Sequence, residues 1–221
     1  MYASNKKNAI YHEILERLLS HRYVFGQKIL VKEISEECGI SRQPIMSALS
    51  SLQERGFVQI TAQVGCEVVN PSSTDVQDFY LMFAANEGII AGLAAERCKP
   101  NEIARLSEIN EKIKLVNSGE LAGTAENYRR LNSDFHRQLH AMARSPIISA
   151  RQIANFELSD FFVVQSCGFK THLDAAIDEH AEIIASLQTG NPQKAKEVAT
   201  SHIESIAKEV IKSMKKQNPH N

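Results

Sequence analysis

The chain has 221 residues, of which 43% are hydrophobic and 23% charged, so it can bury one moderate core or two small ones. Its 25 Lys and Arg residues and 26 Asp and Glu residues leave a formal net charge of −1, so overall charge gives no indication of a nucleic-acid partner. No apolar run reaches the roughly 18 residues of a membrane span, and the four scattered cysteines show no CxxC spacing, which argues against a membrane protein, a thiolate zinc site and a disulfide framework.

The first elements in chain order are two amphipathic helices. One is predicted over residues 8–21, because Ile10, Ile14 and Leu18 recur at helical spacing on one face. The other is a short helix over residues 30–38, which ends at Gly39, a residue type that commonly follows the end of a helix. Since a tight turn connects this helix directly to a third one, the pattern is typical of a helix-turn-helix.

The third helix is predicted to begin at Ser41, whose side chain can cap its N-terminus. Pro44 falls in its first turn, where a missing N–H costs nothing. Arg42 and Gln43 then stand at the exposed N-terminal end, which in a recognition helix meets base edges and phosphates in the major groove. The apolar face of this helix consists of Ile45, Ala48, Leu49 and Leu52.

Two short strands follow the third helix. They are predicted over residues 57–61 and 66–69, with a turn at residues 63–65 between them. A helix followed by such a hairpin is typical of a winged helix-turn-helix. Residues 1–70 carry eight Lys and Arg against seven Glu, so phosphate contacts depend on the local placement of Lys6, Lys7, Arg42 and Arg55, doubled in a dimer.

Beyond residue 70 the predicted structure is entirely helical. A shift to small polar residues at Asn70–Thr74 marks a linker at residues 71–75, so we expect a DNA-binding domain over residues 1–70 and an all-helical domain over residues 76–221. Its predicted helices cover residues 74–98, 100–117, 121–143, 146–165, 171–189 and 192–215. Consecutive amphipathic helices with short Gly, Pro and Ser breaks indicate an antiparallel bundle.

The N-terminal half carries the motif of a known family. Gly26, Ile29 and Ile34 precede the run GISRQPIMSALSSLQERGFV, and Gly65 stands in the wing. This order resembles the N-terminal signature of GntR-family transcriptional regulators. Met46 departs from that signature, because the family usually has a second arginine there; a thioether cannot pair with guanine or clamp a phosphate as a guanidinium does.

The C-terminal half carries a second signature of the same family. LNSDFHRQLH contains Asn132 and His136, DEHAEIIASLQTGN contains Glu179 and His180, and His202 follows twenty-two residues after His180. Together the two signatures cover almost the entire chain, which therefore resembles a GntR-family regulator of the FadR/FCD type. The resemblance implies an N-terminal winged helix-turn-helix with a small β wing and a C-terminal antiparallel bundle of six to seven helices.

The resemblance also implies which residues bind DNA and which bind metal. The DNA-binding residues it implies are Ser41, Arg42, Gln43, Ser47, Arg55 and Gly65, and the implied metal ligands are Asn132, His136, His180 and His202. The three histidines fall within apolar stripes of three different helices and therefore point inward. Three imidazoles with one oxygen suit a divalent ion such as zinc, nickel or manganese, although many family members have Asp where this chain has Asn132.

We therefore expect a cytoplasmic, ligand-responsive regulator, not an enzyme, that binds double-stranded operator DNA as a homodimer. The family resemblance implies a small effector, an organic acid held by the metal. Phe83 stands where members often have an arginine facing the pocket, which argues against a simple dicarboxylate.

Two alternatives stay open. One is a metal-dependent hydrolase in which the histidines activate water and Glu179 is the candidate base. The other is a DNA-binding regulator whose bundle is a metal-free interaction module and whose histidines are core residues. His140 extends the face of Asn132 and His136 at ligand spacing, but it matches no ligand position of the family.

Overall fold

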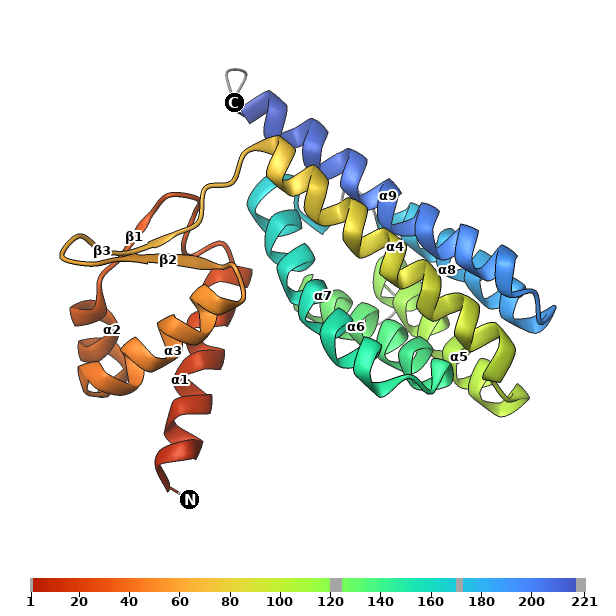
Figure 1. Cartoon of the computed structure of the whole chain (residues 1–221), viewed down its shortest axis with the longest axis horizontal. Coiled ribbons are helices and arrows are strands. Elements are labelled where there is room, and N and C mark those ends of the chain that lie inside the picture. The colour runs from red at the N-terminus through yellow and green to blue at the C-terminus, as the bar shows by residue number, and fades with distance from the viewer. Residues whose placement is uncertain (1, 120–124, 170–172, 218–221) are drawn as a thin grey trace.

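The computed structural model describes residues 2–119, 125–169 and 173–217 and shows an N-terminal head beside an elongated bundle of helices (Figure 1). The head, residues 2–69, contains α1 (Tyr2–Leu19), α2 (Val31–Cys38) and α3 (Arg42–Glu54). Its antiparallel sheet has the order β1-β3-β2, with β1 (Lys28–Ile29), β2 (Val58–Thr61) and β3 (Gly65–Val68). The predicted winged helix-turn-helix is therefore confirmed.

The helices of the head follow from local sequence. Gly39 ends α2 in the left-handed conformation at φ 63°, as expected of a C-terminal cap. Ser41 occupies the N-cap of α3 with extended backbone, although its side chain makes no capping hydrogen bond. The predicted apolar face of α3 is completely buried at Ile45, Ala48, Leu49 and Leu52.

Strand β1 was not predicted. Lys28 and Ile29 pair with Glu67 and Cys66 of β3, which makes the wing a three-stranded sheet. Two residues are too few to show the alternation of apolar and polar side chains that identifies a strand in a sequence. This strand can therefore be identified only from its pairing with β3.

The predicted helical bundle is also confirmed. It consists of α4 (Ser73–Arg97), α5 (Pro100–Ser118), α6 (Ala125–Ala143), α7 (Pro146–Ser166), α8 (Leu173–Gln188) and α9 (Pro192–Gln217). The helix starts predicted at residue 121 and at residues 171–172 lie outside the described residues. Ser72 and Asp75 form a reciprocal capping box at the start of α4, while the domain boundary at residues 71–75 stays a prediction.

The two longest helices, α4 and α9, run side by side along the bundle (Figure 1). Gly88 and Gly92 lie at their contact. A Cβ atom added at Gly88 would come within 2.2 Å of the Thr200 hydroxyl oxygen and 2.9 Å of the Lys196 carbonyl oxygen. Glycine is therefore required at this position, directly beside Glu87, so that the two backbones can approach closely.

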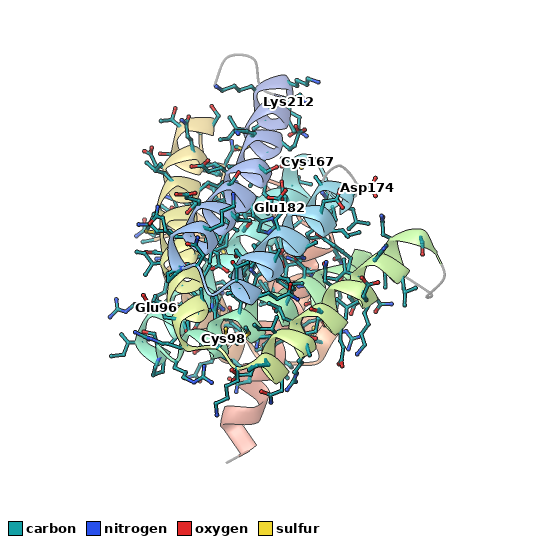
Figure 2. The ribbon with its side chains drawn as sticks, turned by 90° about the vertical axis from the view of Figure 1, so that its right-hand side faces the viewer. Glu96, Cys98, Cys167, Asp174, Glu182 and Lys212 are labelled. Atoms are coloured by element: carbon teal, nitrogen blue, oxygen red, sulfur yellow. The ribbon has the colours of Figure 1, made fainter. Side chains whose placement is uncertain are left out.

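The four cysteines are free thiols, as expected from their spacing. Cys98 lies toward the lower end of the bundle and Cys167 toward the upper end (Figure 2), so these two thiols are far apart. Within the described ranges, no helix combines the length and the apolar character that crossing a bilayer requires.

Candidate functional site

The N-terminal end of α3 opens onto solvent. Ser41, Arg42 and Gln43 are all exposed there, and Ser47 is half-buried one turn later. A groove of about 790 Å³ runs between this end of α3, α2 and the turn between β2 and β3; its lining includes Lys32, Arg42, Met46 and Gly65. The wing and the start of α3 thus form two sides of one concave, accessible surface, the arrangement with which a recognition helix and its wing contact DNA.

Arg55, at the other end of α3, faces the bundle. Its guanidinium donates a hydrogen bond to the Tyr11 hydroxyl and pairs with the Glu157 carboxylate of α7 at 2.8 Å. Arg55 and Glu157 are both half-buried in this contact. The DNA contact expected of Arg55 would require this residue to leave an existing ion pair, and it stays a prediction.

Helices α6 and α7 hold the head through further polar contacts. Arg129 of α6 donates to both carboxylate oxygens of Glu16 in α1, at 2.8 and 2.7 Å. The Gln165 amide of α7 donates to the carbonyl oxygen of Tyr23 at 2.8 Å and accepts from the backbone N–H of Phe25 at 3.1 Å. These bonds tie backbone and side chains of the head to α6 and α7, of which α7 lies on the side of the bundle toward the head in Figure 1.

An apolar contact runs through the same interface. The Phe161 ring of α7 lies 5.4 Å from the rings of Phe25 and Phe57, in edge-to-face geometry with Phe25. Phe57 and Phe161 are completely buried and belong to one hydrophobic cluster that continues from the head into the bundle. Burial of this apolar surface makes α7 part of the core of both regions.

Three histidines meet in the middle of the bundle. His136 comes from α6, His180 from α8 and His202 from α9, and each is at most 1% exposed. One ring nitrogen from each lies within 4.8 Å of those of the other two. The structure therefore brings together the three predicted imidazole ligands, which we call the histidine triad.

Each imidazole of the triad is held by an oxygen atom at its Nδ1. The pairs are His136 with Glu87 at 2.9 Å, His180 with Asn110 at 3.2 Å and His202 with Glu179 at 2.7 Å. Since carboxylate and amide oxygens accept hydrogen bonds, the proton of each neutral ring belongs on Nδ1 and the lone pair on Nε2. Histidines that bind metal ions are usually oriented by oxygen acceptors in this way.

The donor set around the triad fits a divalent ion. The Asn132 Oδ1 atom, one helical turn before His136, is buried and has no hydrogen-bond partner within residues 2–119, 125–169 and 173–217. Two nitrogens bound to one zinc ion at about 2.1 Å cannot be more than about 4.2 Å apart, so a widest separation of up to 4.8 Å closes with small rotations of the rings. Three imidazole nitrogens and one amide oxygen are ligands suited to zinc, nickel or manganese.

Glu87 of α4 was not recognised in the sequence, yet it is central to the cluster. Its side chain is completely buried, with one carboxylate oxygen 2.9 Å from His136 Nδ1 and the other 2.9 Å from His140 Nε2. The Gln152 amide donates a third hydrogen bond to it at 3.2 Å. His140 therefore belongs to the support of the triad and lies outside the set of clustered nitrogens.

The charges of this buried group follow from its contacts. Burial alone would raise the pKa of Glu87, but the charge of His140 and hydrogen bonds from both histidines outweigh it and hold that pKa well below its usual range. Burial lowers the pKa of His136 to about 4, against the opposite effect of the Glu87 hydrogen bond. Near neutral pH Glu87 is a carboxylate and His136 a neutral imidazole.

A small cavity lies beside the triad. Its volume is about 30 Å³, and its lining residues are Phe83, Tyr128, Asn132, Phe156, Ser159, Asp160, Val163, Phe169, Ile203 and Ile206. Phe156 also contacts the triad, because its ring centroid lies 4.3 Å from that of His136. Burial, together with the negative charges of Glu157 and Glu16, outweighs the positive charge of Arg129 and raises the pKa of Asp160 to about 8.

The acidic residues of the cluster orient rings. Glu179, the candidate base of the hydrolase alternative, binds His202 through Nδ1, on the side of the ring opposite the Nε2 lone pair. Glu87 does the same for His136. This arrangement fixes the rings of the triad and leaves neither carboxylate on the Nε2 side of its histidine.

The signals for the missed residues were present in the helical periodicity. Glu87 lies four residues after Phe83 and three before Ile90, inside the predicted inward stripe of α4. Asn110 holds the corresponding place between Leu106 and Ile113 on α5 and is 6% exposed. A polar residue at a position where the period requires an apolar one indicates a buried partner, although the period does not identify that partner.

Both halves of the chain match models of known protein families. Residues 6–68 match the model of bacterial regulatory proteins of the gntR family, and residues 78–205 match the FCD domain. The HTH-type transcriptional repressor RspR of Escherichia coli is 23% identical, covering 94% of this chain and 90% of its own length. The HTH-type transcriptional repressor NanR of Enterobacter is 23% identical, covering 93% of this chain and 85% of its own length.

Solved structures show the same fold. The structure of E. coli McbR/YncC aligns with a TM-score of 0.74 at 16% identity, covering 96% of this chain and 98% of that one. A GntR transcriptional regulator from Rhodococcus aligns with the same TM-score at 14% identity, covering 95% and 99%. At these identities the likeness concerns the fold, including a head and a bundle in one chain.

Proposed function

The chain belongs to the GntR family of bacterial regulatory proteins with an FCD domain and is a DNA-binding transcriptional regulator, and from this premise we propose that its bundle senses a small carboxylate at a metal ion. The observation that carries the proposal is the histidine triad, in which three rings from three helices are each fixed by an oxygen at Nδ1. Three buried imidazoles are costly for a core that serves only packing, because burying polar atoms lowers the stability of the fold. This cost favours a binding role for the triad.

We propose that His136, His180 and His202 hold the ion through Nε2 and that Asn132 adds an oxygen ligand. The ion supplies positive charge to which an effector carboxylate binds. Asn132 brings no charge of its own, so the ion would keep more of its positive charge for the effector than it would beside an aspartate. The Phe83 and Phe156 rings and the rest of the cavity wall shield this contact from water.

For the head, we propose that Ser41, Arg42 and Gln43 contact base edges and phosphates, supported by Ser47 and by the wing at Gly65. All but Ser47 are exposed, and the groove beside them is accessible. One head covers one half-site, so we propose a cytoplasmic homodimer on a pseudo-palindromic operator. The dimer also doubles the phosphate contacts of a chain whose net charge is only −1.

Helix α7 is the proposed connection between effector and head. Phe156 and Asp160 line the cavity on one side of this helix, while Glu157 and Phe161 contact the head on another. An effector that displaces α7 therefore acts on the ion pair of Arg55 and on the buried rings together. Differential contacts of this kind are what a ligand needs to shift the placement of the two heads.

The test is operator binding measured with and without the bound components. Operator fragments selected from the source genome would be titrated by fluorescence anisotropy with metal-free protein, with zinc-loaded protein and with zinc-loaded protein plus a panel of carboxylates. We expect at least one carboxylate to change the operator affinity of the zinc-loaded protein by fivefold or more, in the range of allosteric coupling, and to leave the metal-free protein unaffected.

Two results would contradict the proposal. A carboxylate response that is the same without metal would remove the ion from the mechanism. Tight operator binding that no tested carboxylate changes, in a protein that binds no metal, would favour the metal-free interaction bundle.

A further inference from the structure

The polar residues that line the cavity beside the triad are Tyr128, Asn132, Ser159 and Asp160. Asn132 and Asp160 are the two that carry an amide or carboxyl oxygen. Asn132 Oδ1 is buried, has no hydrogen-bond partner among the described residues, and is contributed to the cavity by α6, the helix of His136. The Asp160 carboxyl is contributed by α7 to the same cavity wall. A ligand bound at the ion and reaching across this cavity therefore meets a carboxyl group, in addition to the rings of Phe83, Phe156 and Phe169.

The surroundings of Asp160 disfavour a second negative charge. Glu16 and Glu157 are close enough to raise its pKa, and the nearby Arg129 already binds Glu16 through both carboxylate oxygens. A second carboxylate on the ligand would be buried here close to the negative charges of Glu16 and Glu157, with little water to screen them. A hydroxyl suits Asp160 in either protonation state, because it both donates and accepts hydrogen bonds.

The size of the cavity limits the ligand. About 30 Å³ holds roughly two water molecules, so a short chain enters with a small displacement of α7 and a longer one would require a larger displacement. We propose that Asp160 is a specificity-determining residue that selects a short-chain hydroxylated monocarboxylate, with the carboxylate at the ion and the hydroxyl at Asp160. This inference rests on the proposed carboxylate effector and names its chemical class.

The experiment is calorimetric titration of the full-length, zinc-loaded protein with four acids of equal carbon number: propanoate, lactate, 3-hydroxypropanoate and malonate. We expect at least one of the two hydroxy acids to bind roughly tenfold more tightly than propanoate, the value of one hydrogen bond to a charged or strongly polar group, and malonate to bind most weakly. Asp160→Ala should abolish the preference for the hydroxyl.

Asp160→Asn is the matched variant, because its amide keeps an acceptor of the same shape without the charge. It should retain a preference for the hydroxyl, and above about pH 8, where the wild-type carboxyl is ionised, it should bind malonate several-fold more tightly than the wild type does. Asp78→Asn, an exposed residue on α4, serves as the control and should change neither preference.

Different results would contradict the carboxylate effector and the role of Asp160. If no acid binds the zinc-loaded protein, the carboxylate effector is wrong and the assignment of Asp160 with it. If the acids bind but the preference for the hydroxyl is missing, or survives in Asp160→Ala because the hydroxyl chelates the ion by itself, the role of Asp160 is overturned while the carboxylate site stands.

Discussion

In the head, Ser41, Arg42 and Gln43 are exposed at the start of α3, whereas in the bundle His136, His180 and His202 are at most 1% exposed. The exposed residues, which we propose as DNA contacts, are free to adapt to a partner surface. The buried ones are each fixed by an oxygen acceptor, so their geometry is set by the fold. A mutation in the first set should therefore change binding alone, and one in the second should change binding and folding together.

The largest expected effect tests the buried side of this comparison. Glu87→Gln removes a buried charge that two histidines and Gln152 contact, and we expect it to lower the free energy of unfolding by about 3 kcal/mol at pH 7. The pKa of Glu87 is lowered in the folded state from its ordinary value of 4.5. The difference in stability between wild type and variant should therefore be largest above pH 4.5 and should shrink as the pH falls below it.

Urea unfolding of metal-free protein over a range of pH measures this effect. Glu96→Gln is the control, since Glu96 lies on the outer side of α4 (Figure 2) and is exposed. Equal stabilities of the Glu87 and Glu96 variants would mean that the buried carboxylate contributes nothing to folding.

The second effect tests the exposed side. Arg42→Ala should lower operator affinity about tenfold per half-site, the cost of one lost base or phosphate contact, and leave the melting temperature unchanged. Arg105→Ala, an exposed arginine on α5, is the matched control. A melting shift as large as that of the Glu87 variant would show that Arg42 has a structural role and would remove the contrast between the two regions.

Asp160 gives a pH dependence opposite in sign to that of Glu87. Its pKa is raised to about 8 in the folded state, so folding is progressively penalised as the pH rises from about 4 to 8. The stability advantage of Asp160→Asn over the wild type should therefore grow by at least about 1 kcal/mol as the pH rises from 5 to 8. Thermal melts of both proteins in the metal-free state check this, and a constant difference would contradict it.

The smallest effect concerns the border between the two regions. Glu157→Gln breaks the ion pair with Arg55, which is half-buried and worth about 0.5–1 kcal/mol. A double-mutant cycle with Arg55→Ala measures the coupling directly. Additive single effects would show that this ion pair does not help to hold the head against α7.

The sequence was sufficient for every element except β1. Helical periodicity located α4 to α9, the family resemblance gave the three histidines, and the apolar stripes showed that they point inward. It did not show Glu87 as the partner of His136, because a bond between residues 49 apart depends on how α4 packs against α6. It also did not show that Arg55 contacts Glu157, because a residue at the end of a recognition helix has the same local sequence signals whichever side it faces.

The central claim is that the triad holds a metal ion, and elemental analysis of protein purified without chelators tests it most directly. Wild type and the exposed-histidine control His12→Ala should carry one ion per chain, and His180→Ala should carry less than a tenth of that amount after dialysis. Equal metal content in wild type and His180→Ala, or no metal and no zinc-induced melting shift in the wild type, would contradict the account and leave three core histidines.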